Sequence, residues 1–281
     1  MNNPGVEPAD LLVKARTVML DALEALAEQR QAVIVIGAQA VYLHTGGLDI
    51  ALAETTKDSD LALDPGLLEP DPKIEQAMRE AGFLPSATGQ PGSWVNADGI
   101  PVDLMVPAKL AGPGTSRGGR IPPHDNKATR RCHGLEAALV DYREMPVESL
   151  DLGDPRVITV KVASPAALIV AKSHKITERL DDLHRLNDKD AHDIYRLFAA
   201  VPTEDLREGF LALLADELSR EVTSNALDQL AEHFAGSEAI GSVMAGRAEE
   251  GVGDPETTAA AVAFLVADLL EALDVISSDR A

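Results

Sequence analysis

The chain has 281 residues, 45% of them hydrophobic and 25% charged, so it can form one large or two smaller domains with their own cores. Its formal net charge of −21 argues against nonspecific nucleic-acid binding, because an acidic surface repels a phosphate backbone. The single cysteine, Cys132, excludes an internal disulfide, and the lack of a ~20-residue apolar run or a secretory pattern predicts a cytoplasmic protein without membrane contact.

The first part of the chain predicts a helix, a strand, a second helix and a second strand. Apolar residues at helical spacing predict a helix over 8–30. The run "AVIVIGAQA" predicts a buried strand over 32–36 that breaks at Gly37 into a helix. After a loop, "DSDLALD" alternates apolar and polar residues, as a strand does. Side chains two apart in a strand share a face, so Asp58 and Asp60 should point the same way.

The middle of the chain predicts more strands and a long basic loop. A short amphipathic helix is expected over 72–82. Two strands are expected in "SWVNADG" and "IPVDLMVP", the second with Asp103 among apolar residues. A loop is expected over 107–131, and loops of this length are usually functional or disordered. The stretch 116–134 contains one acid, Asp125, and five cations, so its local charge is +4. The cations are Arg117, Arg120, Lys127, Arg130 and Arg131.

The second half of the chain predicts mainly helices. The strand-like run "RVITVKVA" precedes Ser164 and Pro165, which suit an N-cap and a first helical position. A second helix holds "KDAHDIYRLFAA", and the segment from Pro202 predicts a helical bundle with 17 acidic and 4 basic residues. We therefore predict a mixed α/β head over 1–162 and a helical domain over 163–281.

Three aspartates of the head are candidate ligands of a hard divalent cation. Two carboxylates on one face of a strand, with a third from a neighbouring strand, offer the oxygen ligands that Mg²⁺ prefers. Cations held in this way bridge nucleotide phosphates and stabilise a phosphoryl group during transfer. The candidates are Asp58, Asp60 and Asp103. An Asp-x-Asp pair also occurs at strand ends that merely face solvent, so the pair alone leaves both interpretations open.

A wider context favours the catalytic interpretation. The run "IGAQAVYLHTGGLDIALAETTKDSDLAL" orders a strand, a glycine turn, a helix and a Thr-x-Asp-x-Asp strand. This order resembles the active site of the DNA polymerase β-like nucleotidyltransferases, and most closely their AbiEii branch of abortive-infection and MenT-type toxins. Later matching pieces are "ALIVAKSHKITER" and "DKDAHDI", so the resemblance covers roughly residues 30–200. It implies a nucleotidyltransferase fold, with a small mixed sheet flanked by helices and a helical C-terminal bundle.

The resemblance implies a role for each matched residue of the head. The metal-binding and catalytic pair corresponds to Asp58 and Asp60, and Asp103 corresponds to the third carboxylate. Positions that contact the nucleotide correspond to Gly37, Ala38 and Lys57. The family usually has serine or glycine where this chain has alanine, and the missing hydroxyl removes one phosphate donor that backbone N–H groups can replace.

The resemblance also implies site residues in the helical domain. Lys172 corresponds to the lysine that contacts the nucleotide phosphates, and Asp190 corresponds to the downstream catalytic acid. Asp193 is the alternative for that acid. By spacing alone, Lys172, Lys175 and Arg179 can share one helix face, which would be cationic.

The implied activity is transfer of a nucleoside monophosphate from a nucleoside triphosphate, with Mg²⁺, to an acceptor. The MenT-type resemblance implies the 3′ end of a tRNA as acceptor, in a toxin–antitoxin system with a cognate antitoxin. The basic loop would then contact RNA phosphates. A small-molecule acceptor of the aminoglycoside kind, or a protein acceptor, is the alternative, because an acidic surface suits a cationic acceptor. A catalytically degenerate nucleotide-binding module is a third possibility, supported by Ala38.

Overall fold

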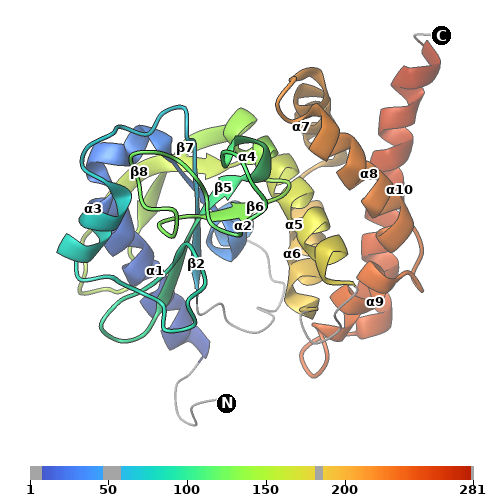
Figure 1. The fold of residues 1–281 in the computed structure, drawn as a ribbon. Coiled ribbons are helices and arrows are strands. Elements are labelled where there is room, and N and C mark those ends of the chain that lie inside the picture. Colours follow the sequence, from blue (N-terminus) through green and yellow to red (C-terminus); the bar gives the residue numbers. More distant parts are fainter. Residues whose placement is uncertain (1–7, 47–57, 181–185, 280–281) are drawn as a thin grey trace. The chain divides into compact units, whose positions relative to one another are not determined.

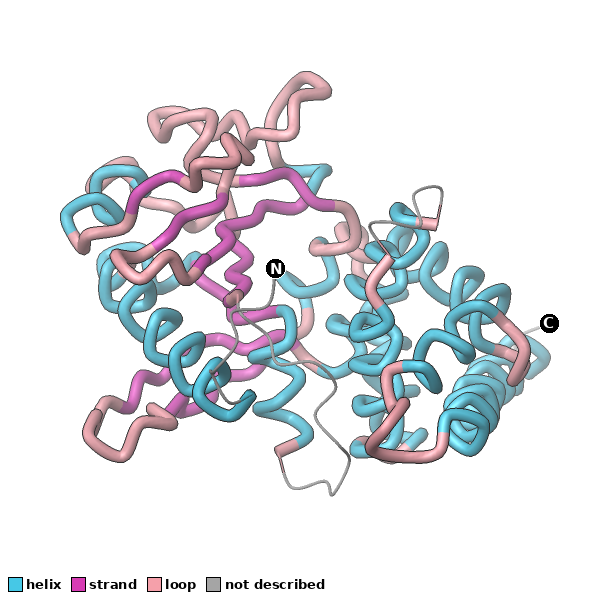
Figure 2. Tube along the Cα trace, turned by 90° about the horizontal axis from the view of Figure 1, so that it is seen from below, coloured by secondary structure: helices cyan, strands magenta, loops and turns pink. Residues whose placement is uncertain are grey.

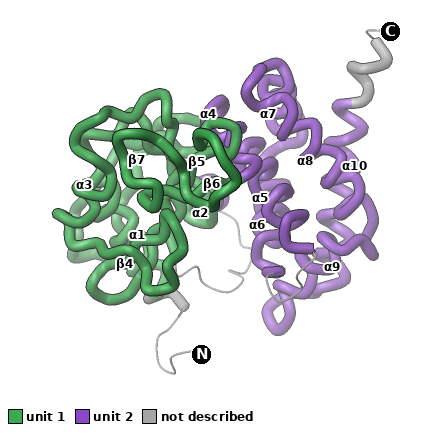
Figure 3. Tube along the Cα trace, in the orientation of Figure 1, with its two compact units in different colours: residues 1–40, 55–132, 142–163 green, residues 41–54, 133–141, 164–281 purple. Residues whose placement is uncertain are grey.

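The computed structural model of the protein describes residues 8–46, 58–180 and 186–279 (Figure 1). The chain divides into two compact units (Figure 3). Unit 1 consists of residues 1–40, 55–132 and 142–163, and unit 2 consists of residues 41–54, 133–141 and 164–281.

Unit 1 contains a mixed β-sheet with helices. Its strands are β1 (Val33–Ile36), β2 (Ser59–Leu63), β3 (Leu84–Pro85), β4 (Ser93–Val95), β5 (Pro101–Pro107), β6 (Arg130–Cys132), β7 (Tyr142–Glu148) and β8 (Val157–Ala163). Its helices are α1 (Pro8–Ala25) and α3 (Ile74–Glu80), with short 3₁₀ turns η1 (Ala27–Ala32) and η2 (Ala108–Leu110). Helix α2 (Gly37–Thr45) begins in unit 1 and continues into unit 2.

The strand order is β3-β4-β5-β2-β1-β8-β7, and β6 pairs with β5 outside this path. Strand β1 is antiparallel to β2 and parallel to β8, while β5 is parallel to both β2 and β6. The predicted mixed α/β fold with a mixed sheet is therefore confirmed. All the described strands lie in unit 1. Figure 2 draws these strands in magenta.

The hydrophobic sequence of β1 explains its central place in the sheet. All four residues of "VIVI" are buried, as expected for a strand covered on both faces. Helix α1 packs against β2 and β5. Its apolar residues at helical spacing supply the core on that side: Ala15, Val18, Met19, Ala22 and Leu23. The helix ends at Ala25, earlier than the predicted residue 30, and η1 replaces its last turn.

Unit 2 is helical, and the predicted C-terminal bundle is confirmed. Its helices are α4 (Glu136–Val140), α5 (Pro165–Arg179), α6 (Asp188–Ala200), α7 (Thr203–Ala215), α8 (Arg220–Phe234), α9 (Ile240–Arg247) and α10 (Pro255–Asp279). The Ser164 hydroxyl accepts a hydrogen bond from the Ala167 N–H at 3.1 Å, so Ser164 is the N-cap of α5 and Pro165 its first residue. None of the described helices combines the length and apolarity that a membrane span needs.

Two segments differ from the predicted elements. Strand β7 and helix α4 lie in a stretch where no element was predicted. Strand β7 is at the edge of the sheet, is mostly exposed and contains Pro146, so it lacks the apolar alternation of a half-buried strand. The predicted loop over 107–131 contains η2 and runs into β6, which pairs with β5. The indole N–H of Trp94 donates to the Ala128 carbonyl at 3.0 Å and ties this loop to the core.

One histidine of this loop gives the fold a predicted pH dependence. His124 is buried, and its Nδ1 accepts a hydrogen bond from the backbone N–H of Ile74, where α3 begins, at 3.2 Å. Burial lowers the pKa of His124; Glu75 raises it and Lys73 lowers it further, so the pKa lies below its usual value. Below about pH 6.5 the unfolded chain therefore binds the proton more readily than the folded one.

We expect the free energy of unfolding to be highest above about pH 6.5 and to decrease as the pH falls from there. In His124→Asn the side-chain oxygen can accept the same hydrogen bond but does not titrate. Thermal unfolding between about pH 7 and 5.5 should show a flatter pH dependence for this variant. An unchanged pH profile would assign the effect to other groups.

Candidate functional site

Asp60 and Asp103 lie side by side on neighbouring strands. Strands β2 and β5 are parallel, and their register pairs Asp60 with Asp103. Paired residues of adjacent strands project from the same face of a sheet, so the two side chains emerge next to one another. On the other side of β2, Asp60 pairs with Ile36, the last residue of β1. The chain turns into α2 immediately after this point.

Gly37 forms the turn between β1 and α2, directly against the Asp60 carboxylate. Its φ of +66° lies in the left-handed region that favours glycine. A Cβ at this position would overlap Oδ2 of Asp60. Glycine therefore lets the backbone approach the carboxylate closely. The contact of Gly37 with a triphosphate, which the resemblance implies, stays a prediction.

Asp58 lies just before β2 and is exposed, two residues ahead of Asp60. Between them, Ser59 is buried, and its hydroxyl donates to the Ala15 carbonyl of α1 at 2.9 Å. This bond anchors the start of β2 on the α1 side. Lys57, the predicted nucleotide contact, lies outside the described residues. Ala38 follows Gly37 and is buried in the first turn of α2.

A buried arginine of α1 supports the same turn. Arg16 Nε donates to Oε1 of Gln39, two residues beyond Gly37, at 2.8 Å, and Nη1 donates to the Glu148 carbonyl at 3.0 Å. Burial lowers the pKa of Arg16 to about 10. This role could not be predicted from the sequence, because an arginine within "LLVKARTVML" is indistinguishable from one on the exposed side of an amphipathic helix.

Asp58 and Asp60 have the carboxylate oxygens that a divalent cation prefers. Oδ2 of Asp60 fills the position beside Gly37 that a Cβ would otherwise take. Asp103 is instead bound by Arg130, whose Nη2 donates to Oδ2 at 2.6 Å. Across the described ranges, no three His, Cys, Asp or Glu side chains are grouped so as to hold a metal ion.

The five cations of the basic loop do not form one outward surface. Three of them are exposed: Arg117, Arg120 and Lys127. Arg130 points to Asp103 instead, and this pairing was not predicted from the sequence. The register of β5 and β6, in which Met105 pairs with Arg130, brings the two together.

Arg131 binds backbone carbonyls at the beginning of its own loop. Its Nη1 donates to the Ala108 carbonyl at 3.1 Å, and its Nη2 donates to the carbonyls of Ala111 and Gly112 at 3.1 and 2.8 Å. The guanidinium thus joins the end of the loop to its beginning. The Nη1 and Nη2 donors of Arg131, a predicted RNA contact, are thus taken up by this chain's own backbone.

In unit 2, helices α5 and α6 bring together the predicted residues of the helical domain. Lys172 Nζ lies 2.6 Å from Oδ2 of Asp193 and 3.4 Å from Oδ1 of Asp190, and all three side chains are buried. Lys175 and Arg179 also reach Asp190, at 2.8 and 3.3 Å. The predicted cationic face of α5 is therefore packed against α6.

Electrostatics keeps Asp190 ionised in this cluster. Burial alone would raise the pKa of Asp190, but Lys175, Lys172 and Arg179 outweigh it and hold the pKa well below its usual range. The Lys172 ammonium therefore has carboxylate partners within its own unit. Its contact with nucleotide phosphates, and the contribution of unit 2 to the site, stay predictions.

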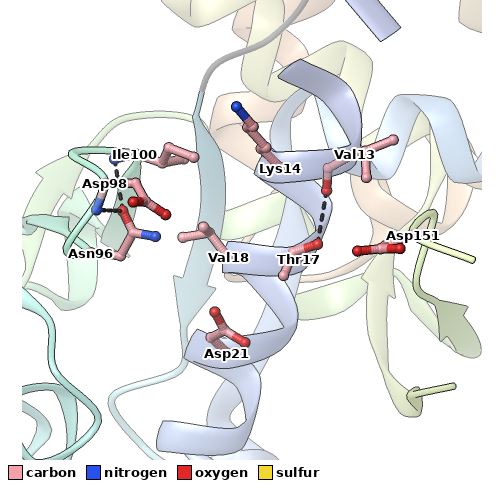
Figure 4. A pocket seen from close by; sticks show the side chains of 9 residues that line it. All are labelled: Val13, Lys14, Thr17, Val18, Asp21, Asn96, Asp98, Ile100 and Asp151. Atoms are coloured by element: carbon pink, nitrogen blue, oxygen red, sulfur yellow. Dashed lines mark hydrogen bonds between the residues drawn. The ribbon is translucent and has the colours of Figure 1, made fainter. Parts of the chain in front are cut away.

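A pocket of about 310 Å³ lies elsewhere in unit 1 (Figure 4). Its walls come from α1, the turn after β4 and the turn after β7, and its charged side chains are Lys14, Asp21, Asp98 and Asp151. Asp21 is also paired with Arg156 at 2.7 Å. None of the site residues predicted from the sequence lines this pocket.

The Gly37 turn allows a matched test of the site. Gly37→Ala adds both left-handed strain and an overlap with the Asp60 carboxylate, so we expect reduced stability and displacement of that carboxylate. Gly82→Ala is the control, because Gly82 has φ +87° but open space around its would-be Cβ. The midpoint of thermal unfolding should fall further in the first variant than in the second. Equal midpoints in both would show that the Asp60 carboxylate does not restrict this turn.

No protein-family model and no curated protein matches this chain. Among solved structures, it is similar to the antibiotic-resistance factor ANT(2'')-Ia, with a TM-score of 0.41, 13% identity and coverage of 79% of this chain and 97% of that chain. It is also similar to an antigenic nucleotidyltransferase-like protein from Paracoccidioides brasiliensis, with a TM-score of 0.38, 17% identity and coverage of 78% and 93%. Both likenesses are distant.

Proposed function

We propose that this protein is a nucleotidyltransferase that moves a nucleoside monophosphate from a nucleoside triphosphate to an acceptor hydroxyl. The observation that carries the proposal is the arrangement around Asp60. Its carboxylate lies against the backbone of the Gly37 turn, in register with Asp103 on the neighbouring strand. The carboxylates can bind a divalent cation, and the helix N-terminus after the glycine turn can bind the phosphates next to that cation.

Each part of this arrangement has a role in the proposed reaction. Asp58 and Asp60 would hold Mg²⁺, which when bound supplies positive charge to the triphosphate. The backbone N–H groups at the start of α2, those of Ala38 and Gln39 among them, would bind phosphate oxygens with the favourable end of the helix dipole. The Gly37 turn lets the triphosphate approach, and Ser59 and Arg16 hold the two chain segments in place.

For the acceptor of this transfer, we propose the 3′ end of a tRNA, as for a toxin of a toxin–antitoxin system. Three exposed loop cations would contact RNA phosphates: Arg117, Arg120 and Lys127. The rest of the surface repels RNA, since the net charge is −21. That charge favours a second candidate acceptor, a cationic small molecule of the aminoglycoside kind.

A charge-matched pair of variants distinguishes these acceptors. We expect Arg117→Ala/Arg120→Ala/Lys127→Ala to lose about tenfold or more of tRNA labelling from an α-labelled triphosphate, with triphosphate binding retained. The control, Lys14→Ala/Lys73→Ala/Arg79→Ala, removes three exposed cations elsewhere in unit 1 and should label tRNA normally. Labelling of an aminoglycoside but not of tRNA by the unaltered protein would favour the cationic acceptor.

A further inference from the structure

Arg130 occupies one oxygen of the Asp103 carboxylate, at which a cation ligated by that oxygen would bind. Its side chain and that of Asp103 are 19% and 13% exposed, so both are largely withdrawn from water. The bond from Nη2 to Oδ2 is 2.6 Å long, and Nη2 also lies 3.5 Å from the sulfur of Met105. A short hydrogen bond between two ionised groups in such surroundings is among the stronger side-chain contacts.

The position of Arg130 is fixed by its strand. Strand β6 is parallel to β5, and its register places Arg130 opposite Met105, two residues along from Asp103. The next residue, Arg131, is bound to three backbone carbonyls, and its N–H donates to the Arg117 carbonyl at 2.8 Å. Arg131 therefore anchors β6, and the anchored strand holds the guanidinium of Arg130 next to Asp103.

The charge of Arg130 also interacts with a second carboxylate, that of Asp60. Burial alone would lower the pKa of Arg130, but Asp103, Cys132 and Asp60 together more than offset it, so the pKa is raised. One guanidinium thus balances one of two carboxylates that are adjacent in the sheet register. Asp58 and Asp60 then supply the two carboxylates with which Mg²⁺ is commonly held alongside substrate phosphates.

We propose that Arg130 is a positioning residue that neutralises Asp103, so that a divalent cation binds through Asp58 and Asp60 and Asp103 is not a ligand. This inference rests on the proposed function, because it concerns the same site. It reverses two expectations from the sequence, that Asp103 binds metal and that Arg130 binds RNA. Asp103 instead orients Arg130, whose charge also interacts with Asp60.

The test is the affinity of the full-length protein for Mn²⁺, measured from the free-ion electron paramagnetic resonance signal. Asp60→Asn should weaken binding by about tenfold or more, because it removes a ligand, and Asp103→Asn should weaken it too, because it leaves the Arg130 charge uncompensated. Arg130→Gln releases Asp103 and removes a competing positive charge, so it should tighten Mn²⁺ binding by about tenfold. A merely structural role of Arg130 would not produce tighter binding.

Two further variants keep the result interpretable if Arg130→Gln folds poorly. Arg130→Lys retains the charge and should bind Mn²⁺ as the unaltered protein does. Arg130→Gln/Asp103→Asn replaces the ion pair by a neutral pair of similar shape and should bind Mn²⁺ no more weakly than the unaltered protein. Weakening by Arg130→Gln/Asp103→Asn as large as that by Asp60→Asn would show that Asp103 is a ligand, which would overturn the inference and leave the proposed function standing. Absence of Mn²⁺ binding by the unaltered protein would overturn both.

Discussion

Asp60→Asn should reduce nucleotidyl transfer by about a thousandfold while the fold is retained. The substitution keeps the shape of the side chain but removes the charge beside the Gly37 turn. Stabilisation of a transferring phosphoryl group by a bound cation contributes several kcal/mol, and about 4 kcal/mol corresponds to a thousandfold in rate. The measurement is the initial rate of label transfer from an α-labelled triphosphate, with thermal unfolding as the check on folding.

An aspartate just beyond the other end of β2 provides the control. Asp64 follows the other end of β2, where its Oδ1 accepts a hydrogen bond from the Gly66 N–H at 2.9 Å. Asp64→Asn makes the same chemical change away from the Gly37 turn, so its transfer rate should stay within about twofold of the unaltered protein. Similar losses from both substitutions would mean that net charge, and not a site at Asp60, determines the rate.

Lys172→Met should lower the free energy of unfolding by about 3–5 kcal/mol. Lys172 is 5% exposed and lies between Asp190 and Asp193, so its removal leaves buried carboxylates with less compensation. The low pKa of Asp190 means that its ionised form contributes to stability above about pH 4, and that this contribution is lost as the pH falls further. Urea unfolding at pH 7, followed by the helical circular dichroism signal, measures the loss.

Two comparisons separate charge from packing in this cluster. Lys175→Met removes a 41% exposed cation and leaves Asp190 with Lys172 and Arg179, so the loss should be about 1 kcal/mol or less. Lys172→Met/Asp193→Leu removes both members of the closest pair and should recover much of the stability lost by Lys172→Met alone. A stability equal to that of the unaltered protein for Lys172→Met would show that the carboxylates are hydrated in solution.

Local patterns in the sequence were sufficient for much of the fold. The apolar run of β1 is followed by a glycine that must turn, and the alternation in "DSDLAL" places Asp60 in β2. The Ser164 cap likewise marks the start of α5. These features depend on neighbours along the chain, so composition and spacing predict them. The apolar stripe of α1 and the helical C-terminal bundle could be predicted for the same reason.

Strand β7 and the pairing of Arg130 could not be predicted in this way. Strand β7 is an exposed edge strand with a proline, so it carries no apolar periodicity. The contact between Arg130 and Asp103 depends on the register of β6 against β5, across 27 residues of chain. Five cations in one loop therefore looked like a single basic surface, although the register turns Arg130 inward and Arg131 binds backbone carbonyls.

The most direct test of the central claim compares triphosphates labelled at the α and γ phosphates. The protein is incubated with Mg²⁺, each labelled triphosphate and a mixture of total RNA, protein and aminoglycosides, in parallel with Asp58→Ala/Asp60→Ala. We predict that the unaltered protein transfers the α label to an acceptor, releases pyrophosphate that carries the γ label, and loses both activities in the variant. Transfer of the γ label, equal turnover by the variant, or triphosphate binding without any turnover would contradict a nucleotidyl transfer site at Asp58 and Asp60.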